Sequence, residues 1–448
     1  MLRNWKKNIP TFQTILSRGI ALSQKIVNYR SKSIGKLIPS EMARRWKKEE
    51  RKKIEVNKKE CSSAYYSYRK MNRLVLIGNG FDLAHGLNTS YKHFVCWYLN
   101  QWGSRLLHGI GKEESDGLLS MKIKDGINVP NWASAFQGWY YKRQNPFVPW
   151  NESDAFFTAL KDRELCDFTF TSPLLLRIWK QLSLGWVDIE NEYFSLLIEE
   201  KISMERGIEA PNYRELNGHL DILRNNLINY LRIEQEREIN TYREIEDKIY
   251  RPIKKKEIAV ANNNFSGNRL GEEIPPSNIM LLNFNYTTTP EMYMHDHNNI
   301  SINYIHGRLD NPESVIFGYG DELDDSYNKL KNRNDNECLC HIKSIRYLES
   351  DNYRKMLEFI ESAPFQICIM GHSCGNSDRT LLNTLFEHHF CTSIKPYYYV
   401  NEEGKDNYLE LVMNISRNFT DMKLMRDRVV NKDYCEALVR ESKNKENN

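Results

Sequence analysis

The chain has 448 residues, 40% of them hydrophobic, and a net charge of +4. This length exceeds what one compact core usually holds, so we expect one large domain with an insertion, or two domains. Nine cysteines without framework spacing and no evident secretory signal indicate reduced thiols and a cytoplasmic location. No apolar run approaches the roughly 20 residues that span a bilayer, so no membrane contact is expected.

Charge divides the chain into a basic arm and an acidic body. Residues 1–70 carry 19 Lys and Arg against 5 Asp and Glu, a net charge of +14, which leaves −10 for residues 71–448. Any affinity for nucleic acid would therefore belong to the arm. We predict that residues 1–70 form a disordered or solvated basic extension. Met71 directly precedes the first predicted strand, so translation could start there.

The first predicted strand spans residues 73–81, where a short apolar run leads into Gly78, Asn79 and Gly80. A strand, a glycine turn and a helix in this order can direct unpaired backbone N–H groups at a nucleotide phosphate. The third glycine of the dinucleotide fingerprint is missing, so the turn could also be purely structural. Asp82 could cap a helix that begins near Leu83, or hold a ribose hydroxyl.

Helical patterns dominate the middle of the chain. Residues 91–106 form an amphipathic segment that we expect to lie on the sheet, and residues 132–231 have helical spacing without β alternation. The apolar stripe in residues 215–250 predicts one or two surface helices that end before Pro252. We therefore predict a mostly helical insertion with a linker over residues 111–275, and an α/β domain over residues 71–110 and 276–448.

Strand-length apolar runs return after the linker, at residues 279–286, 301–305, 315–319, 365–370 and 395–400. Helical patterns at residues 354–362 and 380–389 separate some of them. This alternation is typical of parallel β-α-β units, so the predicted fold class is α/β with a parallel sheet.

Polar residues follow several of these strands, at the edge where ligands of parallel sheets bind. The candidate ligand-binding residues are Gly78, Asn79, Gly80, Asp82, Asn283, Gly371, Ser373 and Asp378. His306 is the candidate general base, because imidazole titrates near neutrality, although a structural histidine would fit equally. Asn285 could orient a ribose hydroxyl or a water, or form an Asx turn.

Five segments, residues 74–87, 186–190, 283–287, 305–308 and 371–378, resemble the bacteriophage abortive-infection AbiH family in the order of that family. The resemblance covers roughly residues 71–400 and implies phage defence. The AbiH family is in turn similar to the Sir2-like fold, whose members bind NAD in a Rossmann-like domain, so the resemblance implies a Rossmann-like parallel sheet. That similarity implies a phosphate loop at Gly78, Asn79 and Gly80, and an adenosine ribose near Gly371 and Ser373. It also implies catalytic roles for Asn285 and His306.

The sirtuin zinc module of four cysteines is absent, so we expect hydrolysis of NAD to ADP-ribose and nicotinamide rather than deacetylation. Asp188, on a predicted helix of the insertion, could approach the ribose or the developing cation, or lie on a solvated acidic face. The expected ligand is NAD or another nucleotide, without a metal, because Cys338, Cys340 and His341 lack a fourth ligand at finger spacing.

Two other functions fit the same residues. Gly371, Ser373 and Gly375 match the nucleophile elbow of a serine hydrolase, but no histidine follows His389. Alternatively, the protein binds a nucleotide as a sensor or scaffold without turnover. Its partners would then be a phage-derived trigger or a second copy of the chain.

Overall fold

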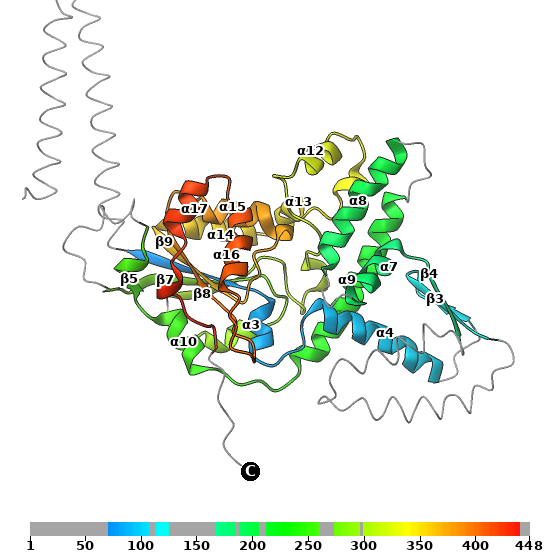
Figure 1. Cartoon of the computed structure of the whole chain (residues 1–448), viewed down its shortest axis with the longest axis horizontal. Coiled ribbons are helices and arrows are strands. Elements are labelled where there is room, and N and C mark those ends of the chain that lie inside the picture. The colour runs from blue at the N-terminus through cyan, green and yellow to red at the C-terminus, as the bar shows by residue number, and fades with distance from the viewer. Residues whose placement is uncertain are drawn as a thin grey trace, which may run out of the picture.

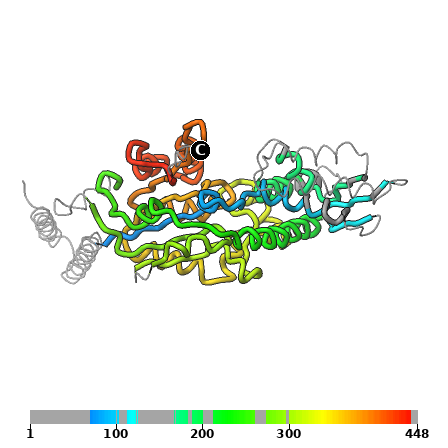
Figure 2. The backbone as a smooth tube through the Cα atoms, turned by 90° about the horizontal axis from the view of Figure 1, so that it is seen from below, coloured from blue at the N-terminus to red at the C-terminus, as the bar shows by residue number. Residues whose placement is uncertain are grey.

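The structure is a computed structural model that describes residues 70–107, 113–124, 166–183, 188–205, 212–259, 273–295 and 299–439. The predicted basic arm lies outside these residues. Two views show a central sheet flanked by helices, with a group of long helices and a small sheet beyond one end of it (Figures 1 and 2).

The central sheet has five strands, and all four pairings are parallel. In chain order the strands are β1 (Met71–Ile77), β7 (Pro276–Asn283), β8 (Ile300–Tyr304), β9 (Phe365–Met370) and β10 (Cys391–Tyr397). Their spatial order is β10-β9-β1-β7-β8. The chain therefore proceeds from β1 through β7 to β8 on one side, and then adds β9 and β10 on the other side. The predicted α/β class with a parallel sheet is confirmed.

Strand β1 is buried along its whole length, because helices cover both faces of the sheet. Leu74 and Leu76 pack on one face with residues of the helices that follow β8, β9 and β10. Val75 and Ile77 pack on the other face. Side chains alternate across a strand, so a central strand with two covered faces requires the continuous apolar run seen in the sequence.

The two helical layers can be followed in Figure 1. One face carries α14 (Asn352–Ser362), α15 (Arg379–Phe386), α16 (Tyr408–Arg417) and α17 (Met422–Arg428). The other face carries α3 (Asn79–Ala84) and α10 (Arg243–Tyr250). Two short helices, α12 (Asp325–Lys331) and α13 (Lys343–Arg346), lie between β8 and α14.

The helices inserted between β1 and β7 have a core of their own. They are α4 (Tyr91–Leu107), α7 (Pro173–Ser183), α8 (Ile189–Glu205) and α9 (Tyr213–Gln235). The expectation that residues 91–106 lie on the sheet is wrong, because the buried face of α4, including Phe94 and Trp102, packs in this second core. The helices predicted in residues 215–250 are confirmed as α9 and α10.

The structure differs from the sequence prediction in two places that concern strands. The segment before α7 includes an antiparallel sheet that the sequence does not predict, made of β2 (Glu113–Ser115), β3 (Leu119–Ile123) and β4 (Cys166–Phe170). The predicted strand at residues 315–319 is absent. These residues are buried, but Ile316 N donates to His306 O at 2.9 Å and Gly318 N donates to Glu190 Oε1 at 3.2 Å, and neither acceptor belongs to a strand. Among the described residues, no helix has the length and apolar character to cross a membrane.

Candidate functional site

The loops that follow β1 and β9 are in direct backbone contact. Gly80 N donates to Gly371 O at 2.8 Å, and Gly78 N donates to Met370 O at 3.2 Å. A Cβ atom on Gly78 would lie 2.5 Å from His372 Cα, which is closer than packed atoms can approach. Glycine at these positions is therefore required by the close approach of two adjacent loops.

The turn after β1 differs from the free-amide turn that the sequence suggests. Gly80 N–H is already bound to Gly371, and Phe81 N donates to Gly78 O at 2.8 Å. The helix that follows, α3, has only six residues. Asn79 is exposed, and its side-chain oxygen accepts a bond from the Thr89 hydroxyl at 2.6 Å. Asn79 is therefore the member of this turn that is open to solvent.

Asp82 lies inside α3 and does not cap it, because the helix starts at Asn79, after Gly78 in an extended conformation. Its side chain is 1% exposed. Oδ2 accepts a hydrogen bond from the Thr287 hydroxyl at 2.6 Å, and Oδ1 is buried without a hydrogen-bond partner among the described residues. Burial raises the pKa of Asp82 to about 6, although the Thr287 hydroxyl opposes the shift. Asp82 is thus buried behind the turn after β1, where it bonds to Thr287, and its carboxylate does not face the solvent, where a ribose would bind.

The two asparagines after β7 have different roles. Asn283 is fully buried, and its side-chain oxygen accepts a bond from Asn285 N at 3.1 Å, so the Asx turn belongs to Asn283. Its amide donates to Thr287 O at 2.9 Å. Asn285 is partly exposed, and its amide donates to Gly78 O at 3.0 Å. The loops after β1, β7 and β9 are therefore joined by hydrogen bonds.

His306 follows β8 and is 4% exposed. Its Nδ1 lies 3.3 Å from Phe284 O, and its Nε2 lies 3.1 Å from the Tyr347 hydroxyl and 3.3 Å from Asp378 Oδ1. Burial and the nearby Lys343 ammonium lower the pKa of His306, against the attraction of Asp378. The ring is therefore neutral at pH 7, and a proton on Nδ1 would leave Nε2 as an acceptor.

Asp378 joins His306 to the loop after β9. Its Oδ2 lies 3.5 Å from His372 Nε2, and its Oδ1 accepts a bond from Lys343 Nζ at 2.9 Å. Burial alone would raise the pKa of Asp378, but the Lys343 ammonium holds it well below its usual range. The Asp378 carboxylate is thus ionised, and it lies next to the imidazoles of His306 and His372.

Lys343 extends this network to the helical insertion. Its Nζ donates to Glu190 Oε2 on α8 at 2.9 Å, and Glu190 Oε1 accepts from Gly318 N at 3.2 Å. Burial would lower the pKa of Lys343, but the charges of Asp378 and Glu190 raise it. Burial raises the pKa of Glu190 to about 7. Sequence reasoning missed Lys343 because no motif marks a lysine in a four-residue helix such as α13.

Asp188, predicted as a catalytic residue, lies at the start of α8. Its Oδ1 accepts a bond from Asn191 N at 3.0 Å, as in a helix cap. Burial raises its pKa, and Lys343 opposes that shift. Ile189, Tyr193 and Leu197, at helical spacing, form the buried face of this helix.

The loop after β9 does not have the geometry of a nucleophile elbow. The non-glycine residue with positive φ in this loop is Cys374, at 55°, rather than Ser373. Ser373 is exposed, and His372 Nδ1 accepts a bond from Cys374 N at 3.0 Å. Burial raises the pKa of the Cys374 thiol. Cys338 and Cys340 also point apart, since the first is fully buried and the second exposed.

The candidate site is thus a continuous chain of contacts from Asn285 through Gly78, Gly371 and His372 to Asp378 and His306. The family model for bacteriophage abortive infection AbiH matches residues 74–399. The chain belongs to the AbiH family. A comparison with curated proteins gave no match. The AbiH match includes every residue of this site, residues 74–77 of β1 and the other four strands of the central sheet, and it implies a role in bacteriophage abortive infection.

The raised pKa of Asp82 predicts a pH-dependent stability for this AbiH protein. The folded state holds the Asp82 proton more tightly than the unfolded state does, so the stabilisation is present below pH 4 and lost as pH rises through about 6. Asp82→Asn removes this effect. The stability of Asp82→Asn relative to the unmodified protein should therefore rise by up to about 3 kcal/mol between pH 4 and pH 7.5. Urea unfolding at both pH values measures this difference, and equal pH slopes would contradict it.

Proposed function

We propose that this AbiH protein defends against bacteriophage by cleaving NAD to ADP-ribose and nicotinamide at the carboxyl edge of its central sheet. The strand order supports a Rossmann-like, Sir2-like relationship, because β7 and β8 extend from β1 on one side and β9 and β10 on the other. Such a reversal is where open parallel sheets bind nucleotides. The proposal depends on one observation: Asn285 bonds to the Gly78 carbonyl, while His306 shares Asp378 with His372 of the adjoining loop.

The residues have the following roles in this proposal. Asn285 orients the ribose or the attacking water, and His306 Nε2 polarises that water once the Tyr347 hydroxyl has moved away from it. Asp378 stabilises the positive charge that His306 gains. The glycosidic bond to nicotinamide breaks through an oxocarbenium-like transition state. Asn79 and Ser373, which are exposed, contact the pyrophosphate and the adenosine ribose.

A second function, nucleotide binding without turnover, is favoured by the burial of His306. Both nitrogens of this ring already face protein groups. In that case the bound nucleotide would act as a signal to a partner or to a second copy of the chain. The ligand would then stabilise the folded protein without being consumed.

Incubation of the purified full chain with NAD separates the two functions. If His306 is the base, His306→Ala should slow nicotinamide release by at least about 100-fold, and Asn285→Ala should also slow it strongly. His219→Ala truncates another buried histidine, on α9, and should retain activity. Turnover that survives both site substitutions would exclude the proposed site. Thermal stabilisation by NAD without product would support the binding function instead.

A further inference from the structure

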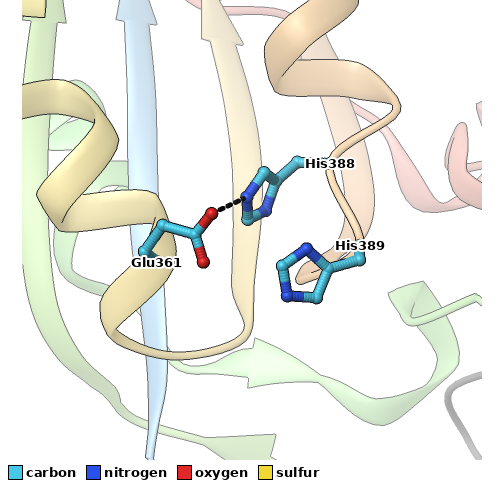
Figure 3. Close-up of side chains that lie close together, drawn as sticks. All are labelled: Glu361, His388 and His389. Atoms are coloured by element: carbon cyan, nitrogen blue, oxygen red, sulfur yellow. Dashed lines mark hydrogen bonds and ion pairs between the residues drawn. The ribbon is translucent and has the colours of Figure 1, made fainter.

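A separate cluster of side chains lies at the opposite, amino-terminal edge of the sheet. Glu361 is in the last turn of α14, before β9, and His388 and His389 are in the turn between α15 and β10. Figure 3 shows the three side chains gathered beside the starts of these two adjacent strands. We propose that Glu361, His388 and His389 bind a divalent transition-metal ion, with Zn²⁺ as the probe.

The distances suit a site that closes around an ion. One potential ligand atom from each residue lies within 4.8 Å of the others, and Glu361 Oε1 is 3.2 Å from His388 Nε2. Zinc bonds of about 2.0–2.1 Å place neighbouring tetrahedral ligands roughly 3.3 Å apart. Glu361 and His389 are exposed and can rotate by the ångström or so that is needed. Within the described part of the chain, neither ring nitrogen of His389 has a hydrogen-bond partner.

The backbone that carries these side chains is fixed by the sheet. Phe365 N of β9 donates to Phe390 O at 2.9 Å, and Cys391 N donates to His388 O at 2.9 Å. The His388 ring also packs on Phe365, with 5.6 Å between ring centroids. Because both segments are held where β9 and β10 begin, only side-chain rotation is required to bind an ion.

The donor set selects the class of metal. Two imidazoles and one carboxylate suit Zn²⁺, Ni²⁺ or Cu²⁺, whereas Mg²⁺ and Ca²⁺ prefer oxygen ligands. His388 Nδ1 accepts a bond from Phe390 N at 3.2 Å, so the proton lies on Nε2, toward Glu361. When the metal binds Nε2, the imidazole proton moves to Nδ1, and the weak bond from Phe390 N is given up. Glu387 is bound to Thr420 and Asp421, so water completes the coordination.

Calorimetric titration of the metal-stripped full chain with Zn²⁺ tests the proposal. We expect His389→Ala to lose one Zn²⁺ site or to bind there at least about tenfold more weakly, since even supporting residues of metal sites have effects of that size. Zn²⁺ should also raise the melting temperature of the unmodified chain, but not of His389→Ala. Mg²⁺ should produce neither effect.

His295→Ala is the matched control. His295 also pairs with a glutamate on the surface, Glu246, at 2.7 Å, but no second histidine of the described residues joins that pair. This variant should bind Zn²⁺ like the unmodified chain. Glu361→Gln, which keeps the shape of the side chain, must weaken the same site. Equal stoichiometry and affinity in the unmodified chain, His389→Ala and Glu361→Gln would overturn the proposal, whatever the outcome with NAD.

Discussion

Replacing Lys343 by methionine is expected to lower the free energy of unfolding by about 3–5 kcal/mol, because the substitution leaves two buried carboxylates without their cation. Lys343 is 1% exposed and binds both Glu190 and Asp378 at 2.9 Å. Methionine fills much of the same volume, so the loss would measure charge rather than packing. Chemical denaturation at pH 7.5 gives the value.

Two comparisons distinguish this effect from a general loss of stability. Lys432→Met removes a lysine that is also paired at 2.7 Å, with Asp406, but on the surface, and it should change stability little. The destabilisation by Lys343→Met should also shrink toward pH 5. Without the cation the pKa of the buried Glu190 carboxyl group rises further above its unfolded value, and the pKa of Asp378 is no longer held low. Protonation of these groups as pH falls then favours the folded state. A loss that is small, or that does not vary with pH, would show that this network contributes little.

The sequence predicts the parts of the site that depend on strands. The apolar run of β1 and the polar residues after β1, β7, β8 and β9 are local patterns, and parallel strands bring their carboxyl ends to one edge. Asn285, His306 and Asp378 lie at this edge, where Asn285 bonds to the Gly78 carbonyl and His306 contacts Asp378. The apolar run at residues 315–319 is not a strand. An apolar run indicates that a segment is buried, but it does not determine which groups accept hydrogen bonds from the backbone amides of that segment.

Long-range pairing could not be predicted in this way. Glu190 and Lys343 are 153 positions apart, and their contact depends on how the insertion packs against the loop after β8. The position of Asp82 in its helix differs from the prediction for another reason. The helix begins three residues before Asp82, because the extended Gly78 allows α3 to start at once. A shift of this size at a helix end turns a capping residue into a buried one.

The contact between the loops after β1 and β9 predicts a severe effect of Gly371→Ala. Gly371 has a φ of 76°, and an added Cβ would lie 2.1 Å from Phe81 N and 2.5 Å from Gly80 C. Both atoms are backbone, so neither can rotate away. The left-handed conformation and the overlap together should lower the free energy of unfolding by about 2–5 kcal/mol. Thermal or urea unfolding measures the loss.

Gly404→Ala separates the two contributions. Gly404 has nearly the same φ, 78°, but no atom lies within 4 Å of the position of an added Cβ. This variant should lose only the conformational part, about 1–2 kcal/mol. The excess loss in Gly371→Ala then measures how tightly the two loops are pressed together. If both variants lose the same amount, the loops are not in close contact, and Gly78 and Asn285 would no longer be held in a fixed position relative to His372 and Asp378.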